Sequence, residues 1–533
     1  MEAIETNMES RGKEGFDMTN TNMRQDSRQS EHEEALKIAE EAVQAGAARA
    51  AQDPFRLRYH LMAPSGWMND PNGLIHFKGE YHAFYQHFPF GDYQGPMYWG
   101  HAVSRDLVRW EHRPVALAPT EPYEFGSPEG GCGCWSGSAV EHQGQMVLFY
   151  TAHVDGRTPE EVQAMATSED GIRFVKHPDP VIQGSPDGEC FGFRDPKVWE
   201  HEGRWYMVIG SGKNGRGRAL LYESLNLLDW SYRGVAAESD GTQGDMWECP
   251  DLFPLGGKYV LIVSPMNMDG VKNLYMIGEM DFAAGRFIPE SSGTIDDGPD
   301  FYAAQTMRDN NGRRILIAWM DMWGSRLIKT GRAWYGAMTL ARELQLTEDG
   351  RLASRPVEEL ASLRGQEISK LDNGLRLQPG EERIWLLPPA FEWQADIDLS
   401  ATEAQELRIV ISGACEDLSD AEFIETSRSV TDQRTKIRWL AAQRRIELNR
   451  NEAGIGDPGV YVSDLPASAA ARLSLRLFSD NSSIELFVND GDRVLTSRIY
   501  PQASGRRLEL QAVGGTIVFE AMRLWNIDGL EVK

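Results

Sequence analysis

The stretch HEGRWYMVIGS, residues 201–211, has a glycine after a short polar turn, then a polar residue, then an apolar and aromatic run of strand length. The same form recurs as FKGEYHAFYQH (77–87), HQGQMVLFYTA (142–152), LGGKYVLIVSP (255–265) and NNGRRILIAWM (310–320). Each unit of about 55 to 65 residues is too short for a domain of its own, and long helical periodicity is missing between residues 55 and 350. The repeat therefore predicts a five-bladed β-propeller built from four-stranded sheets.

Three carboxylates occupy one position within this repeat. Asp70, Asp195 and Glu248 lie eight or nine residues before the glycine of units one, three and four, and the equivalent stretches of units two and five are 135–140 and 300–306. If the glycine turn joins the first two strands of a blade, the preceding segment is the innermost strand, and the three acids converge at one end of the central channel. Two of them form Asp-Pro pairs, which are also common turn dipeptides, but a turn does not account for the glutamate.

Two carboxylates that face each other across a pocket are the machinery of glycoside hydrolysis. Aromatic side chains near the same motifs offer flat faces for a sugar; they are Trp67, Trp99, Trp135, Trp247 and Trp319. A calcium site is disfavoured because no DxDxDG loop is present, and the pair Cys132 and Cys134 lacks a second ligand pair at zinc-finger spacing. We therefore expect acid–base chemistry with no metal and no cofactor.

Seven motifs, in chain order, carry a resemblance to a known family. They are WMNDPNG (67–73), YHAFYQ (81–86), WGHAVS (99–104), WSGSAV (135–140), FRDPKVW (193–199), WECPDLF (247–253) and DFYAAQ (300–305). Together they resemble glycoside hydrolase family 32, the group of invertases, levanases, inulinases and sucrose-6-phosphate hydrolases, from about residue 55 to the C-terminus. The resemblance implies an all-β chain, a five-bladed propeller followed by a C-terminal β-sandwich.

The resemblance also implies roles for individual residues. Asp70 matches the nucleophile, Glu248 the general acid/base, and Asp195 the acid that holds fructosyl hydroxyls and stabilises the transition state. Direct sugar contacts are expected from the matching positions and the nearby tryptophans; these are Trp67, Asn69, Gln86, Trp99, Trp135, Ser136, Arg194, Tyr302 and Trp319.

The activity implied is that of a retaining β-fructosidase acting on sucrose or short fructo-oligosaccharides. A fructosyltransferase would use the same three acids, with a sugar hydroxyl in place of water. A non-catalytic sugar-binding propeller is the alternative from another class, and loss of one of the acids would have favoured it. Sucrose-6-phosphate would require a basic subsite, and none is identifiable in the sequence.

The chain divides into four parts by composition. Residues 1–52 form a polar extension in which we expect disorder over the first thirty residues and a short helix over 31–51. The propeller is expected over 53–354 and a linker over 355–379, with a short helix in it. Residues 380–533 show alternating segments and a hairpin over 482–501, which predict an antiparallel sandwich with a structural role.

Bulk composition excludes several classes of partner. The net charge of −26 disfavours nucleic acid and anionic membranes, because the field repels phosphates. No apolar run of about 18 residues suggests a membrane span, and no secretory signal precedes the repeats, so we expect a cytoplasmic protein. The five cysteines are odd in number and sparse, which predicts reduced thiols. The expected partner is a small sugar; self-association stays open.

Overall fold

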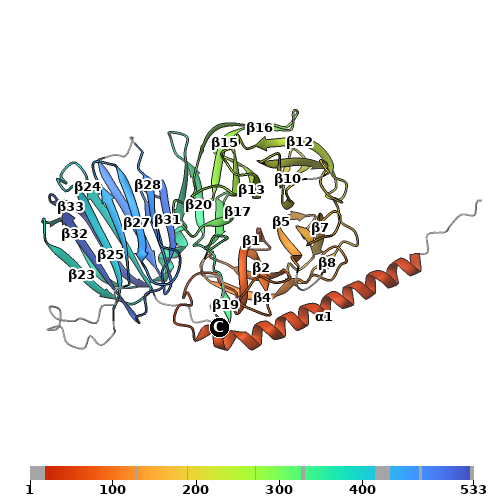
Figure 1. The fold of residues 1–533 in the computed structure, drawn as a ribbon, viewed down its shortest axis with the longest axis horizontal. Coiled ribbons are helices and arrows are strands. Elements are labelled where there is room, and N and C mark those ends of the chain that lie inside the picture. The colour runs from red at the N-terminus through yellow and green to blue at the C-terminus, as the bar shows by residue number, and fades with distance from the viewer. Residues whose placement is uncertain are drawn as a thin grey trace, which may run out of the picture.

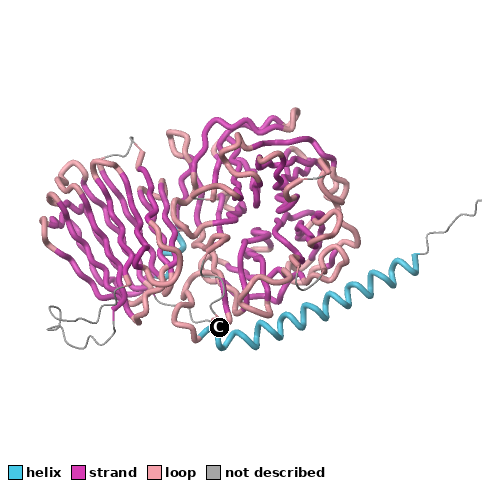
Figure 2. Tube along the Cα trace, viewed as in Figure 1, coloured by secondary structure: helices cyan, strands magenta, loops and turns pink. Residues whose placement is uncertain are grey.

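The computed structural model describes residues 18–126, 130–188, 190–270, 272–325, 331–414, 433–466 and 471–527. Small sheets are arranged in a ring, a two-layered block of strands lies beside it, and one long helix runs along the ring (Figure 1). Strands dominate both units (Figure 2). The predicted all-β architecture of a five-bladed propeller followed by a sandwich is confirmed.

Four antiparallel strands form the core of each blade. Blade one contains β1 (Gly66–Phe77), β2 (Glu80–Phe88), β3 (Tyr98–Ser104) and β4 (Trp110–Leu117). Blade two contains β5 (Cys132–His142), β6 (Gln145–Val154), β7 (Glu161–Ser168) and β8 (Val175–Lys176). Blade three contains β9 (Phe193–His201), β10 (Arg204–Lys213), β11 (Arg216–Ser224) and β12 (Ser231–Glu238). Blade four contains β13 (Met246–Leu255), β14 (Lys258–Met266), β15 (Leu274–Asp281) and β16 (Arg286–Gly293), and blade five contains β17 (Tyr302–Arg308), β18 (Arg314–Trp319), β20 (Arg342–Leu346) and β21 (Leu352–Pro356).

The repeated glycine stands between the first two strands of every blade, as predicted. In blade one, for example, Gly79 has a φ of 87°, a conformation that glycine adopts without the steric cost a side chain would add. The first strands contact one another in the ring order β1, β5, β9, β13, β17 and back to β1. A short strand, β19 (Trp334–Tyr335), leaves blade five and pairs in parallel with β1, which joins the last blade to the first.

Each innermost strand is interrupted by a bulge at the same height. The pairing with the second strand breaks between Met68 and Pro71 in β1, between Cys134 and Gly137 in β5, and between Glu248 and Asp251 in β13. Equivalent breaks occur in β9 and β17. A bulge bends the strand and re-aims its side chains, so the three acids leave the sheet at the point where the five strands meet.

Two six-stranded sheets form the sandwich, and its core is a continuous apolar cluster that includes Trp393, Ile409 and Leu508. One sheet has the order β22 (Arg364–Leu377), β33 (Ile517–Ile527), β24 (Phe391–Asp398), β29 (Arg472–Ser479), β30 (Ser483–Val488), β31 (Arg493–Arg498). The other has the order β23 (Glu382–Leu387), β32 (Gly505–Val513), β25 (Glu406–Ala414), β26 (Arg434–Leu440), β27 (Arg445–Glu452), β28 (Val460–Asp464). The predicted hairpin is β30–β31, turning through Asn489 and Asp490, both with positive φ.

The expected linker over 355–379 is different in the structure. A 3₁₀ helix, η1 (Glu358–Leu363), follows the propeller, and β22 then fills most of the remaining range as an edge strand of the sandwich. Strand β22 pairs with β33, the last strand of the sandwich in the sequence. Such a distant pairing cannot be recognised from the local sequence pattern.

Helix α1 (Met18–Ala51) begins well before the predicted residue 31. The expected disorder of the first thirty residues is therefore wrong for 18–30, while residues 1–17 lie outside the described part of the chain. A contact with the body accompanies the extension, because Nη1 of Arg28 donates to the Pro178 carbonyl at 3.1 Å and lies 3.3 Å from Oε2 of Glu121. Among the described residues, no helix has the length and apolar character that crossing a membrane requires.

Candidate active site

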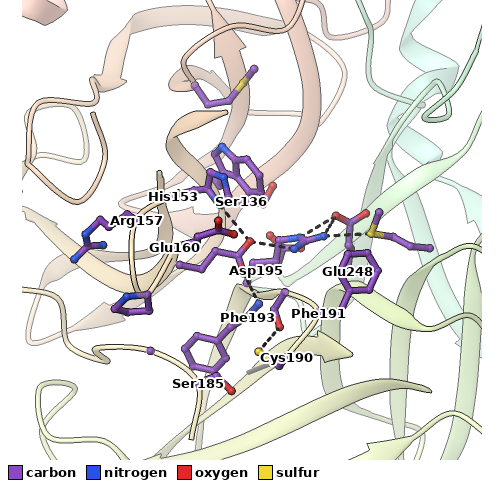
Figure 3. A pocket seen from close by; sticks show the side chains of 18 of the residues that line it. Ser136, His153, Arg157, Glu160, Ser185, Cys190, Phe191, Phe193, Asp195 and Glu248 are labelled. Atoms are coloured by element: carbon purple, nitrogen blue, oxygen red, sulfur yellow. Dashed lines mark hydrogen bonds and ion pairs between the residues drawn. The ribbon is translucent and has the colours of Figure 1, made fainter. Parts of the chain in front are cut away.

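A cavity of about 1340 Å³ opens where the bulged segments of the inner strands meet. Asp70, Asp195 and Glu248 all line it, each from the innermost strand of its own blade. Figure 3 shows Asp195 and Glu248 among the lining side chains. The predicted convergence of the three carboxylates is thus present in the structure. Most of the rest of the wall comes from the first strands and from the loops that follow β2, β6 and β8, and Trp323 adds to it from the segment after β18.

Asp70 receives hydrogen bonds only from uncharged groups. Its Oδ2 accepts from the Ser136 hydroxyl at 2.8 Å, and its Oδ1 accepts from the Asn69 amide at 3.0 Å. The side chain is largely buried, with 8% of the residue exposed. Burial and the nearby charge of Glu248 raise the pKa of Asp70 to about 6, against the lowering effect of these hydrogen bonds. Asp70 is therefore mostly ionised at neutral pH, and no cationic side chain within the described ranges forms a salt bridge with it.

Glu248 is held by donors on both oxygens. The Arg194 guanidinium donates to Oε1 from Nε at 2.9 Å and from Nη2 at 2.8 Å. The Tyr302 hydroxyl donates to Oε2 at 2.5 Å. These contacts fix the orientation of the carboxyl group, which still faces the cavity.

Asp195 has a left-handed backbone, with a φ of 65°, and its Oδ2 accepts a hydrogen bond from the Cys249 amide at 2.9 Å. A non-glycine residue in this conformation is strained, and such strain concentrates at functional sites. Burial, followed by the charge of Glu248, raises the pKa of Asp195, and the charge of Arg194 acts in the opposite direction. The Cys249 thiol bridges two acids, since its Sγ lies 3.7 Å from Oδ2 of Asp70 and 3.5 Å from Oδ2 of Asp195.

A fourth acid, Glu161 at the start of β7, escaped the sequence prediction. Its Oε1 accepts a hydrogen bond from Nη1 of Arg194 at 3.0 Å. His153 lies beside it, with Nδ1 3.4 Å from the same oxygen, and its ring stacks on Trp135 at a centroid distance of 3.6 Å. Glu161 lies in the third strand of its blade, whereas the other three acids lie in first strands. The recurrence before the glycine turns, which identified those acids, therefore could not identify Glu161.

Five of the predicted sugar contacts line the cavity, namely Asn69, Gln86, Trp135, Ser136 and Arg194. The other four, Trp67, Trp99, Tyr302 and Trp319, do not line it and are at most 1% exposed. Direct sugar contact by these four residues stays a prediction.

These four aromatic residues support the wall from behind. The Trp67 indole donates to Oδ1 of Asn69 at 2.6 Å, and the Trp99 indole donates to the Trp135 carbonyl at 3.1 Å. Trp319 packs edge-on against Trp323 at 4.9 Å, and Trp323 is the tryptophan of this group that reaches the cavity. The motif 67–73 contains both kinds of residue, since Trp67 lies behind the wall while Asn69 and Asp70 line the cavity.

No cluster of three or more His, Cys, Asp or Glu side chains within the described ranges has the spacing of a metal site. The four cysteines in those ranges, Cys132, Cys134, Cys190 and Cys249, are free thiols. Cys415 lies outside the described residues.

Comparison with known proteins gives consistent matches over nearly the whole chain. The model of the glycosyl hydrolases family 32 N-terminal domain matches residues 60–356, and that of the family 32 C-terminal domain matches residues 359–526. A sucrose-6-phosphate hydrolase of Escherichia coli is 39% identical over 89% of this chain and 95% of its own length, and a raffinose invertase of the same species is 39% identical over 92% and 99%.

Solved structures with the same architecture accompany these relatives. The GH32 β-fructofuranosidase BmSUC1 of Bombyx mori superposes with a TM-score of 0.78 at 33% identity, covering 93% of this chain and 99% of its own. A variant of that enzyme in complex with sucrose gives a TM-score of 0.79 at 33% identity with the same coverage.

Proposed function

The chain belongs to glycosyl hydrolase family 32, and from that premise we propose that it is a retaining β-fructofuranosidase that releases terminal fructosyl units from sucrose or short fructo-oligosaccharides. The observation that carries the proposal is the pairing of two acids with opposite environments in one cavity. Asp70 has no cationic partner in the part of the chain that the structure describes, whereas Glu248 is oriented by Arg194 and Tyr302. Such a pair suits a nucleophile and a proton donor.

In the first step Asp70 attacks the anomeric C2 of the fructosyl unit. The bond from C2 to the bridging oxygen breaks, and the departing oxygen takes the proton of Glu248. A covalent ester between C2 and the Asp70 carboxylate results, with inversion at C2. Asp195 hydrogen-bonds to fructosyl hydroxyls and so fixes the ring during the attack.

In the second step Glu248, now ionised, removes a proton from water, and the water oxygen attacks C2 of the ester. Asp70 leaves as a carboxylate, Glu248 regains its proton, and the configuration at C2 is restored. The Ser136 hydroxyl and the Asn69 amide stabilise the carboxylate of Asp70 before attack and after release.

The cavity is suited to a neutral substrate of more than one sugar unit. Its volume of about 1340 Å³ exceeds the roughly 300–1,000 Å³ typical of small-ligand pockets. The acids that line it are Asp70, Glu160, Glu161, Asp195 and Glu248, against the two arginines Arg157 and Arg194. This surplus of negative charge disfavours a phosphorylated sugar relative to the neutral one.

The test is to incubate the purified protein with sucrose, raffinose, 1-kestose and sucrose-6-phosphate, and to measure free fructose and longer products. We expect fructose from the neutral substrates, at higher kcat/KM than from sucrose-6-phosphate. Methanol added as acceptor should give the β-configured methyl fructofuranoside, because the mechanism retains configuration.

The outcomes separate the alternatives. Products longer than the substrate, at the expense of free fructose, would identify a fructosyltransferase. Binding of these sugars without any turnover would identify a sugar-binding propeller and contradict the proposal.

A further inference from the structure

Arg194 binds Glu248 in a way that opposes the role of a proton donor. Its Nε and Nη2 both donate to Oε1, at 2.9 and 2.8 Å, and the Tyr302 hydroxyl donates to Oε2 at 2.5 Å. A bidentate guanidinium contact and a hydroxyl donor both stabilise the carboxylate form. A general acid, however, must carry its proton when the substrate arrives.

Two further acids carry charge near Glu248. Asp70 on β1 and Asp195 on β9 each interact electrostatically with it across the cavity. Both of these side chains have raised pKa values, because of burial first and of Glu248 second.

Glu161 opposes Arg194 directly. Its Oε1 accepts from Nη1 of Arg194 at 3.0 Å, and its Oε2 accepts from the Phe193 amide. Burial alone would raise the pKa of Glu161, but the charge of Arg194, with His153 and the Phe193 amide, lowers it to about 2. Glu161 therefore carries a full negative charge at every working pH, and one guanidinium is shared between two carboxylates.

The groups that face Glu161 come from two neighbouring strands. Arg194 and the Phe193 amide belong to β9, and His153 belongs to β6. The other ring nitrogen of His153 lies 2.7 Å from Oδ1 of Asp155, an exposed acid at the rim. The described residues within reach of Glu161 thus include one permanent cation, which is the same cation that binds Glu248.

We propose that Glu161 is a positioning residue that keeps Glu248 competent as the general acid by binding one arm of Arg194 and withdrawing part of its charge. The inference rests on the proposed function and adds to it a residue that no motif marked. Without Glu161, the whole charge of Arg194 acts on Glu248, which then loses its proton at lower pH.

The decisive variant is Glu161→Gln, whose amide oxygen still accepts from Arg194 but carries no charge. In the free enzyme the alkaline limb of kcat/KM reports the general acid. We expect this limb, measured with sucrose, to move to lower pH by about one unit, the size of effect produced by one charge a few ångströms away. At a pH above the alkaline limb, kcat/KM of the variant for sucrose should be about tenfold lower than that of the wild type.

A substrate that needs no proton donor distinguishes this role from a structural one. With 4-nitrophenyl β-D-fructofuranoside the leaving group departs as a stable anion, so the loss for Glu161→Gln should be several times smaller than with sucrose. A variant that merely disturbed packing would lower both activities alike.

Glu160 provides a matched control. It lines the same cavity, is exposed, and its side chain accepts a hydrogen bond from the Gly156 amide at 3.0 Å without contacting Arg194. Glu160→Gln removes the same charge one position away, and we expect its alkaline limb to coincide with that of the wild type.

Each outcome decides the question. Equal losses on both substrates with an unmoved alkaline limb overturn the positioning role of Glu161. If Glu161→Gln does not fold, Glu161→Asp takes its place, because it moves the charge away from Arg194 by one methylene. Its alkaline limb must then move to lower pH by a smaller amount, and an unmoved limb overturns the proposal. A wild type that releases no fructose from any substrate overturns the proposed function and this inference together.

Discussion

Two clusters of buried charge in this chain differ in how their acids are compensated. One is the group in the cavity; the other, which we call the domain-interface cluster, joins the propeller to the sandwich. Its members are His60, Asp296, Asp300, Asp321, Arg342, Arg450, Asp480, Glu485 and Arg498.

Every acid of the domain-interface cluster has a cationic partner. Arg342 donates to Asp296 at 2.9 Å and to Glu485 at 2.6 Å, and none of these three side chains is exposed. His60 lies 2.8 Å from Asp480. Burial alone would lower the pKa of His60, but its hydrogen bonds to Asp480 and Glu485 raise it to about 9, so it is an imidazolium at neutral pH.

In the cavity, by contrast, Asp70 and Asp195 form no salt bridge with any described residue. Buried charges without a partner cost stability. Acids that are paired with cations therefore join the two domains. Acids without a cationic partner lower the stability of the fold, and they lie where the reaction takes place.

The largest expected effect is that of Asp70→Asn. The variant loses the nucleophile, so kcat on sucrose should fall by roughly 10³-fold or more. It should also gain stability above pH 6, because the folded state no longer holds an ionised carboxyl whose pKa is raised from 3.8 to about 6. At 1.4 kcal/mol per pKa unit the gain is about 3 kcal/mol, and it disappears below about pH 4. Urea denaturation at pH 5 and pH 8 measures it.

The exposed Asp269, which has no described partner, is the control, and Asp269→Asn should change neither quantity. A loss of stability in Asp70→Asn at pH 8 would contradict the distinction between the two clusters.

Arg342→Met tests the domain-interface cluster, where we expect a loss of stability in place of the gain expected for Asp70→Asn. It leaves Asp296 and Glu485 buried without their guanidinium, and breaking such a pair typically costs about 3–5 kcal/mol. We expect a loss of this size in urea denaturation, with kcat of the folded protein within about twofold of the wild type. The exposed pair of Lys258 with Glu279 gives the control, because Lys258→Met should not change the midpoint. An unchanged midpoint for Arg342→Met would show that compensation of charge is not what stabilises the interface.

The pH dependence of the wild type should separate the clusters without any substitution. Asp70 must be ionised to attack, and burial raises its pKa to about 6. Below that pH the ionised fraction falls, so kcat/KM should decline about tenfold per unit. The fold itself should persist to lower pH, because the interface acids are paired. An acid limb near pH 4, the usual range of a carboxyl, would contradict the assigned environment of Asp70.

The blades of the propeller and the place of its three acids could be predicted from the sequence, because the propeller is built from repeats. Five glycine turns revealed the blades, and the recurrence of polar residues before them brought Asp70, Asp195 and Glu248 to one place. Residues at the same position of each repeat occupy the same place in each blade. Because the blades form a ring, such residues on the innermost strands lie close together at its centre.

Other features lacked such a signal. Trp67 belongs to the same motif as the cavity residues Asn69 and Asp70, and the motif does not tell which of its side chains line the cavity and which lie behind it. Glu161 stands in a third strand, where no recurrence exists. Strand β22 and the first half of α1 depend on partners far away in the sequence, which local propensity does not register.

The smallest effect concerns the thiol that bridges the two unpaired acids. Cys249 supplies a weak S–H donor to Asp70 and is itself neutral, because burial, followed by the charge of Asp195, raises its pKa. In Cys249→Ala this donor is lost, so the pKa of Asp70 should rise and the acid limb of kcat/KM should move to higher pH by a few tenths of a unit, with the maximal kcat within about threefold. Cys132→Ala, at a buried thiol outside the cavity lining, should leave the limb unmoved. A shift to lower pH in Cys249→Ala would mean that the thiol does not stabilise the ionised acids, and that their charge is compensated by the backbone and hydroxyl donors alone.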